Sequence, residues 1–317
     1  MAKYIISADG GTTNTRLVLL KGGKEADRIK ISIGAGSTAK NGNNSELKSE
    51  FKKHLCELLS KNGLCESDIE CIVLSGMICS ELGLYCVPHV SAPAGVSELK
   101  AASETVSLPE ITSIPMTFIP GVKVVSENVT DTDIMRGEET ELTGIKELLG
   151  LSGSFVLLLP GTHNKIIFAD ADGRIVNFFT AMSGELTKAV CDNTILKEAL
   201  DGGFTKTPDT DAVLSGYDVA EQFGVTAALF KVRILSKFGD YSAMQLYSFL
   251  LGVILHDDVT LTVKKAKGAK IIIAGSEPFK TALKAIFDSR TELSSELVSD
   301  EIADKCVSVG QLAVVNN

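Results

Sequence analysis

Short apolar runs and glycine-rich turns alternate at the start of the chain. Residues 4–8 are rich in β-favouring side chains, and the polar turn 9–14 (DGGTTN) separates them from a second such run at 16–20. After the next glycine turn, residues 28–33 alternate between polar and apolar side chains, which is the pattern of a half-buried strand. These runs predict a meander of three strands, whereas a Rossmann unit would enter a helix after its first strand.

The same order of strands and turns returns 150 residues later without a gap. The second copy consists of strands at 155–159, 165–169 and 174–180, with turns at 160–164 and 172–173. At this offset the segment Gly11-Thr12-Thr13-Asn14 is matched by Gly161-Thr162-His163-Asn164. A repeat of two turns and three strands predicts two similar domains that face each other.

Apolar spacing along the rest of the chain predicts helices and buried strands. Helices are expected at 46–62, from about 133 to 149, from about 183 to 200, from about 242 to 265 and at 300–315, and strands at 71–74 and 270–274. Residues 91–120 contain four prolines and are expected to form loops and short strands. The expected domains are 1–120 and 121–317, and the last helix is a candidate to pack back on the first domain.

Both matched turns are suited to binding phosphate. A tight turn between strands presents several backbone N–H groups to one point, glycine permits close approach, and Thr and Asn add side-chain donors. The residues expected to bind phosphate are Gly10, Gly11, Thr12, Thr13 and Asn14 in the first turn and Gly161, Thr162 and His163 in the second. One such turn alone would be read as an ordinary hairpin turn, and for His163 a structural role stays open. The duplication favours phosphate binding.

The two copies differ at the position before the turn, where Asp9 in the first is matched by Leu159 in the second. A single carboxylate is enough to hold Mg²⁺ through water, because this ion keeps most of its hydration. Asp9 is therefore the expected metal ligand, with a turn-forming role as the alternative. A third glycine turn, Gly275-Ser276, follows an apolar run and is expected to lie against adenosine unless it is a plain connection. The Walker A pattern does not occur in the sequence.

An acidic stretch at 131–140 (DTDIMRGEET) precedes the second turn. Asp133 and Glu138 are candidates for the general base that accepts a proton from a substrate hydroxyl. Helix capping by Asp133 and solvation of Glu138 are the alternatives. Arg136 has the fork geometry for a substrate carboxylate, but pairing with its acidic neighbours explains it equally well.

The composition narrows the class of protein. The 317 residues carry a net charge of −9 with no basic run, which argues against nucleic-acid binding. No apolar stretch approaches the ~20 residues that span a bilayer, and the N-terminus lacks the apolar core of a signal peptide. Seven cysteines without a CxxC motif indicate free thiols in a reducing compartment. We therefore expect a cytoplasmic protein without nucleic-acid or membrane partners.

Seven segments together resemble the 2-dehydro-3-deoxygalactonokinase family, sugar-acid kinases of the actin/hexokinase/chaperone superfamily. They are DGGTTNTR at 9–16, GM at 76–77, PHVSAPA at 88–94, MRGEETE at 135–141, PGTHNK at 160–165, MSGEL at 182–186 and AGS at 274–276. The resemblance implies an α/β fold of two actin/hexokinase-like (ribonuclease H-like) domains. Each would have a mixed sheet that opens with the meander and is flanked by helices, with a cleft between the domains.

The resemblance also implies an activity, namely ATP-dependent phosphorylation of 2-dehydro-3-deoxy-D-galactonate at its 6-hydroxyl, in galactonate catabolism. It implies ATP and Mg²⁺ as cofactors and a sugar acid as the small-molecule partner, while a homodimer stays open. The residues that it points to for substrate binding are Arg16, Gly76, Met77, Arg136 and Glu185.

Two positions depart from the family pattern. Cys79 stands where a glycine is expected, and Leu84 stands where an aromatic side chain is expected. Because both follow Gly76-Met77, a kinase of another sugar or sugar acid is the first alternative. A nucleotide-binding switch of the actin-like class is the second, and a binding protein without catalysis is the third.

Overall fold

The computed structural model describes residues 4–316, which divide into two compact units. Unit 1 comprises residues 4–152, 173–176 and 300–316 of the described chain, and unit 2 comprises residues 153–172 and 177–299. The chain therefore leaves unit 1, forms unit 2 and returns to unit 1 for its last helix.

A six-stranded mixed sheet forms the centre of unit 1, in the order β3-β2-β1-β4-β7-β6. The strands are β1 (Tyr4–Gly10), β2 (Thr15–Lys21), β3 (Lys24–Ile31), β4 (Ile69–Gly76), β6 (Glu104–Val106) and β7 (Met116–Phe118). The first three pair antiparallel as the predicted meander, whereas β4 runs parallel to β1 and β7 parallel to β4. The register places Asp9 on β1 opposite Arg16 on β2 and Gly10 beside Gly76 on β4.

The helices of unit 1 are α1 (Ala35–Asn41), α2 (Ser45–Lys61), α3 (Val96–Ala102), α4 (Glu138–Leu149) and α11 (Asp300–Asn316). Three 3-10 turns, η1 (Glu66–Asp68), η2 (Met77–Cys79) and η3 (Val129–Asp131), lie in the segments that flank the strands. A small sheet holds β5 (Val90–Ser91), β8 (Val122–Val124) and β9 (Asp133–Met135) in that order. The apolar face of α2, including Leu47, Phe51 and Leu55, is buried in the same core as Ile6 and Leu17 of the sheet.

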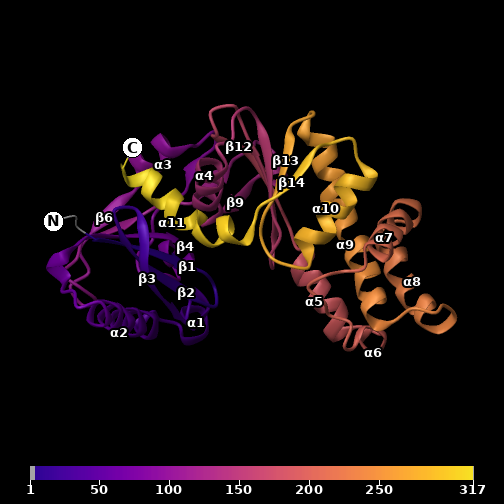
Figure 1. The fold of residues 1–317 in the computed structure, drawn as a ribbon, viewed down its shortest axis with the longest axis horizontal. Coiled ribbons are helices and arrows are strands. Elements are labelled where there is room, and N and C mark those ends of the chain that lie inside the picture. The colour runs from indigo at the N-terminus through magenta and orange to yellow at the C-terminus, as the bar shows by residue number, and fades with distance from the viewer. Residues whose placement is uncertain (1–3, 317) are drawn as a thin grey trace. The chain divides into compact units, whose positions relative to one another are not determined.

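Helix α11 lies along α4 within unit 1 (Figure 1). Glycines allow this close approach, because a Cβ at Gly144 would lie 1.7 Å from the carbonyl oxygen of Cys306 and a Cβ at Gly310 would lie 1.9 Å from that of Thr140. The side chain of Gln311 donates from α11 to the backbone of Ala8 on β1. The end of the chain is thus built into the core that supports the first turn.

Unit 2 repeats the strand order of unit 1 in a five-stranded sheet, β12-β11-β10-β13-β14. The strands are β10 (Phe155–Leu159), β11 (Asn164–Ala169), β12 (Ile175–Ala181), β13 (Lys270–Ile273) and β14 (Ser295–Leu297). β10 pairs antiparallel with β11 and parallel with β13, as β1 does with β2 and β4. The duplication predicted from the glycine turns is therefore confirmed as two sheets of related topology.

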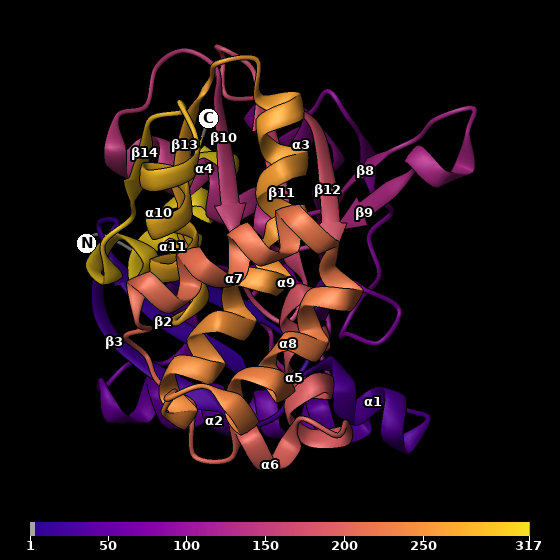
Figure 2. The same cartoon turned by 90° about the vertical axis from the view of Figure 1, so that its right-hand side faces the viewer.

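The helices of unit 2 are α5 (Ser183–Asn193), α6 (Lys197–Leu200), α7 (Thr210–Phe223), α8 (Val225–Phe238), α9 (Ala243–Ala266) and α10 (Phe279–Arg290). Helices α7, α8 and α9 pack together, as Figure 2 shows. A Cβ at Gly216 or at Gly252 would meet the backbone of the facing helix at 2.0 or 1.9 Å. Helix α9 is long and apolar enough to span a membrane, but 72% of its apolar stretch is buried inside the protein, as in a core helix.

Three expectations about elements are wrong. Residues 133–135 form strand β9, and the helix begins only at Glu138, after Gly137 turns the chain with a φ of 113°. The helix expected at 183–200 is broken after Asn193, where the Thr194 hydroxyl donates to the carbonyl of Val190. The segment 91–120 contains helix α3, whose first turn is capped by a hydrogen bond from the Gly95 N–H to the Glu98 carboxylate.

Candidate functional site

The first glycine turn connects β1 and β2 and is fixed by backbone hydrogen bonds. The Gly11 N–H donates to the Asn14 carbonyl at 2.9 Å, and the carbonyls of Gly11 and Thr12 accept from the start of α1 at 3.0 and 2.8 Å. Gly34 permits this contact, because a Cβ there would lie 2.3 Å from the Gly11 carbonyl oxygen. Thr12 and Thr13 are exposed at the tip of the turn, so their side chains are accessible to a ligand.

Asp9 lies at the base of this turn and pairs with Arg16. The Arg16 guanidinium is 3.4 Å from the Asp9 carboxylate on one side and 3.1 Å from Asp304 of α11 on the other. About a third of the Asp9 side chain (35%) is exposed. Burial of the remainder raises the pKa of Asp9, and Arg16 opposes this shift. One ionisable carboxylate therefore lies beside the first turn, held by a cation from the next strand.

Three further acids come from the first turn of α4. Burial, and then the charge of Glu138, raises the pKa of Glu139 to about 8, and Glu139 accepts hydrogen bonds from the Gly137 N–H at 2.8 and 2.9 Å. Burial also raises the pKa of Glu141 to about 8, followed by the charges of Glu138 and Asp9. Both side chains therefore bind a proton at higher pH than an ordinary glutamate does. Glu138 and Asp9 are connected through Glu141, because the charges of both raise the pKa of Glu141.

Asp133 is positioned differently from the sequence expectation. It lies on β9 opposite Val124, is partly exposed, and accepts a hydrogen bond from the N–H of Ile134 at 2.7 Å. It therefore does not stand at a helix N-terminus. Glu138 is the first residue of α4, and its carboxylate accepts from the Arg136 N–H at 3.0 Å.

Arg136 joins two sequence segments that are almost 50 residues apart. Its Nη2 donates to the Val87 carbonyl at 2.8 Å and lies 3.3 Å from Nδ1 of His89. Its buried Nη1 has no hydrogen-bond partner among residues 4–316. Burial, and then the charges of Arg136 and Lys123, lowers the pKa of His89 to about 4, so the imidazole is neutral and Nδ1 can accept. The guanidinium thus keeps donors that the protein does not satisfy.

The second glycine turn connects β10 and β11 and uses a related device. The Glu185 N–H at the start of α5 donates to the Thr162 carbonyl at 2.9 Å. Gly184 allows the contact, since a Cβ there would lie 1.9 Å from the Gly161 carbonyl oxygen. The Glu185 carboxylate lies 2.8 Å from Nε2 of His163, with both side chains half exposed. In the structure Glu185 is therefore paired with a residue of the turn itself.

Gly76 and Gly275 occupy similar places in the two sheets. Gly76 ends β4 and Gly275 follows β13, and these are the strands that run parallel to the first strand of each sheet. Both glycines have a positive φ, 84° and 79°. A Cβ at Gly76 would lie 2.6 Å from the carbonyl oxygen of Gly10, and a Cβ at Gly275 would lie 2.4 Å from that of Pro160. The Ser276 N–H donates to the same Pro160 oxygen at 3.1 Å. Each glycine turn is thus supported by a position at which only a residue without a side chain fits.

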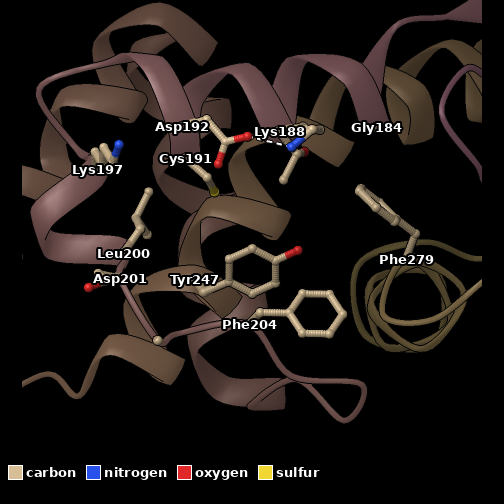
Figure 3. A pocket seen from close by; sticks show the side chains of 12 residues that line it. Gly184, Lys188, Cys191, Asp192, Lys197, Leu200, Asp201, Phe204, Tyr247 and Phe279 are labelled. Atoms are coloured by element: carbon tan, nitrogen blue, oxygen red, sulfur yellow. Dashed lines mark hydrogen bonds and ion pairs between the residues drawn. The ribbon is translucent and has the colours of Figure 1, made fainter.

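A cavity of about 480 Å³ opens beside the second turn within unit 2. Its lining includes Gly184 of α5, which packs on the second turn, Phe279 at the start of α10, and the aromatic rings of Phe204 and Tyr247 (Figure 3). Lys188 and Asp192 form an ion pair at its wall. Sequence reasoning missed these residues, because they are scattered over four segments.

The residues at the first turn fit a hydrated Mg²⁺ ion. A partly exposed carboxylate, Asp9, stands next to a turn with accessible hydroxyl groups, which suits a metal held through water and phosphate oxygens rather than by a protein cage. The part of the chain that the structure describes contains no group of three or more His, Cys, Asp or Glu side chains arranged to hold a metal directly.

The two sheets, with their matched strand order and supported glycine turns, define an actin/hexokinase-like α/β fold. A solved structure of a candidate 2-dehydro-3-deoxygalactonokinase from Sinorhizobium meliloti has this fold, with a TM-score of 0.80 and 24% identity over 99% of this chain and 98% of that chain. Residues 9–312 match the model of the 2-keto-3-deoxy-galactonokinase family. The chain belongs to this family, and the resemblance seen in the sequence is confirmed.

Curated relatives carry the same enzyme name. The 2-dehydro-3-deoxygalactonokinase of Escherichia coli (strain K12) is 28% identical over 191 residues, which is 59% of this chain. A Rhizobium meliloti (strain 1021) relative, given the name provisionally, is 30% identical over 201 residues, or 63% of this chain. The chain spans about 60% of the length of each of these relatives.

Proposed function

We propose that this chain is an ATP-dependent kinase that phosphorylates the 6-hydroxyl of 2-dehydro-3-deoxy-D-galactonate, a step of galactonate catabolism. The observation that carries the proposal is the duplicated glycine turn, supported in each sheet by a glycine of positive φ. The names of the curated relatives supply the substrate. Free thiols at all seven cysteines support a cytoplasmic location.

The nucleotide would be bound by unit 2 through its turn and the adjoining cavity. Backbone N–H groups and the hydroxyl of Thr162 would bind phosphate, and Gly275-Ser276 would lie against adenosine. The rings of Phe204 and Tyr247 offer apolar surface suited to a base, and the cavity volume of about 480 Å³ falls within the usual range for small-molecule sites. Mg²⁺, when bound, neutralises phosphate charge, and Asp9 would hold it through water.

The sugar acid would be bound by unit 1. The unsatisfied Nη1 of Arg136 supports binding of a carboxylate, and Arg16 is the second candidate. Gly76 and Met77 would contact the sugar as the family pattern implies. Cys79 and Leu84, which depart from that pattern, are buried in the core of unit 1, so their side chains are packing residues. These two departures therefore give no reason to prefer another acceptor.

The proposal is tested by measuring ADP release with Mg-ATP across a panel of acceptors. The panel holds 2-keto-3-deoxy sugar acids, aldonic acids and neutral hexoses. The 2-keto-3-deoxy acids are expected to react fastest, because a neutral sugar would leave Arg136 unpaired in the occupied site. A neutral hexose preferred over every acid would overturn the proposal, and ATP binding without transfer to any acceptor would favour a nucleotide-binding switch.

Arg136→Lys is expected to raise KM for the sugar acid by roughly tenfold to 100-fold, the worth of one or two charge-assisted hydrogen bonds. Lysine keeps the charge but loses the fork. The KM for ATP should change by less than about threefold, because the lost contact is with the sugar acid and not with the nucleotide. Arg290→Lys is the matched control. Arg290 is exposed and its guanidinium binds both carboxylate oxygens of Asp218, so the change should alter neither KM. Equal losses for both substrates would assign Arg136 to the fold or to phosphate.

A further inference from the structure

We propose that Asp258, on α9, is a positioning residue that sets the shape of the second phosphate turn through Asn164. This inference rests on the proposed function, since the turn is assigned there to ATP. Asp258 does not touch the tip of the turn. It acts through the two side chains that it binds.

The contacts form a short relay from the core to the turn backbone. Asp258 is buried, with 5% of its surface exposed. Its carboxylate accepts from Nδ2 of Asn164 at 2.7 Å and from the Ser183 hydroxyl at 2.8 and 2.9 Å. Oδ1 of Asn164 in turn accepts from the Gly161 N–H at 3.0 Å.

The relay fixes which way the Asn164 amide faces. An amide has one donating end and one accepting end, so a carboxylate at one end leaves the oxygen for the other. Because the Asp258 carboxylate only accepts when ionised, the Asn164 oxygen is directed at Gly161. Burial raises the pKa of Asp258 to about 6, whereas the bonds from Asn164 and Ser183 lower it, so the group is mostly ionised at about pH 7.5.

The same carboxylate also holds the other side of the turn. Ser183 is the first residue of α5 and precedes Gly184, which packs on the Gly161 carbonyl, and Glu185, whose N–H binds Thr162. Asp258 therefore connects α9 to both the turn and the helix that closes over it. Gly161 and Thr162 are held from two directions by one buried acid.

The first turn reaches a similar shape without such a relay. There the Gly11 N–H donates to the backbone carbonyl of Asn14 rather than to a side chain. The matched position in unit 2 thus replaces a local bond by one that depends on α9. This difference makes the second turn sensitive to a residue 94 positions away in the sequence.

Asp258→Asn is the test, since it keeps the size and removes one acceptor. When the Nδ2 group of the new asparagine takes the place of Oδ2, the oxygen that accepts from both side chains, its N–H groups face Asn164. The Asn164 amide must then turn over and face Gly161 with its own donors. We expect KM for ATP to rise at least about tenfold and hydrogen exchange at the Gly161 amide to quicken by about tenfold or more without nucleotide. Asp257→Asn, an adjacent exposed acid, is the matched control and should change neither.

The exchanged pair Asn164→Asp with Asp258→Asn separates positioning from general loss of stability. The carboxylate introduced at position 164 would accept both from the Gly161 N–H and from the amide introduced at position 258. The bond from Gly161 keeps its direction, while the bond between positions 164 and 258 is rebuilt with donor and acceptor exchanged. Protection of the Gly161 amide should return, and KM for ATP should recover at least about threefold relative to Asp258→Asn. If Asp258→Asn fails to fold, the exchanged pair alone decides, because a folded pair with an unprotected Gly161 amide contradicts the proposal.

Two results would overturn the inference: normal protection of Gly161 in Asp258→Asn, or an exchanged pair no better than the single variant. The hydrogen-exchange measurement does not depend on enzyme activity. A wild-type protein that transfers phosphate to no acceptor would therefore refute the kinase assignment while leaving the role of Asp258 to be decided at Gly161.

Discussion

Asp9→Asn is expected to lower kcat by about 100-fold to 1,000-fold, the usual loss when a group that stabilises transition-state charge is removed. Asp9 ends β1 beside the first turn, partly exposed, where its carboxylate can hold the water shell of Mg²⁺. Asparagine keeps the shape of the side chain, so the fold should survive. The rate is measured at saturating Mg-ATP and sugar acid, with the melting temperature recorded alongside.

Asp304→Asn is the control that this prediction requires. Asp304 contacts the same Arg16 guanidinium at 3.1 Å but comes from α11. Asp304 also pairs with Arg28 at 2.6 Å, so the variant removes two exposed ion pairs, which should change kcat by less than about fivefold. If both variants lost activity equally, Arg16 rather than the metal would be the affected group. Near-normal turnover of Asp9→Asn would remove the metal role.

Glu138→Gln is expected to lower the rate of phosphoryl transfer by about 100-fold to 10,000-fold, as for loss of a general base, with ATP binding retained. The choice of Glu138 follows from its surroundings. Glu138 is the first residue of α4, and its charge raises the pKa values of Glu139 and Glu141. The charge of Asp9 also raises the pKa of Glu141. Glutamine still accepts the N–H of Arg136, so the local backbone is preserved.

Asp133→Asn is the matched variant, because Asp133 is the other candidate base. The sequence placed Asp133 at the start of a helix, but in the structure it lies on β9 and the helix begins at Glu138. Its variant should keep much of the wild-type rate. Single-turnover measurements with both proteins decide between them. A loss confined to Asp133→Asn would reverse the assignment, and normal rates in both would leave catalysis to positioning and charge stabilisation.

Most of the fold could be predicted from local patterns in the sequence. The two meanders could be predicted because each consists of short β-rich runs separated by glycines, and the fixed offset of 150 residues made the duplication visible. The predictions failed where a short element depends on its neighbours. Strand β9 has only three residues and exists because it pairs with β8, so an acidic sequence there resembled a helix start.

The candidate site could be predicted from the sequence only where its residues lie close together along the chain. The turns, Asp9 and the acidic stretch could be found from residue types at close spacing. The contact of Arg136 with Val87 and His89 requires the return of the chain through β8 and β9. Asp258 lies in an apolar helix, and nothing in its sequence surroundings connects it with Asn164. Long-range packing brings these groups together, and a single sequence does not encode it in a readable pattern.

Product analysis tests the central claim most directly. Purified protein, Mg-ATP and 2-dehydro-3-deoxy-D-galactonate are incubated, and the product is identified by mass and by phosphorus–proton coupling. The expected product is the sugar acid with one phosphate on its 6-oxygen, formed in equal amount with ADP and about 100-fold to 1,000-fold more slowly when Asp9→Asn replaces the wild type. ADP formed without a phosphorylated sugar acid, or phosphate on another oxygen, would contradict the proposed reaction.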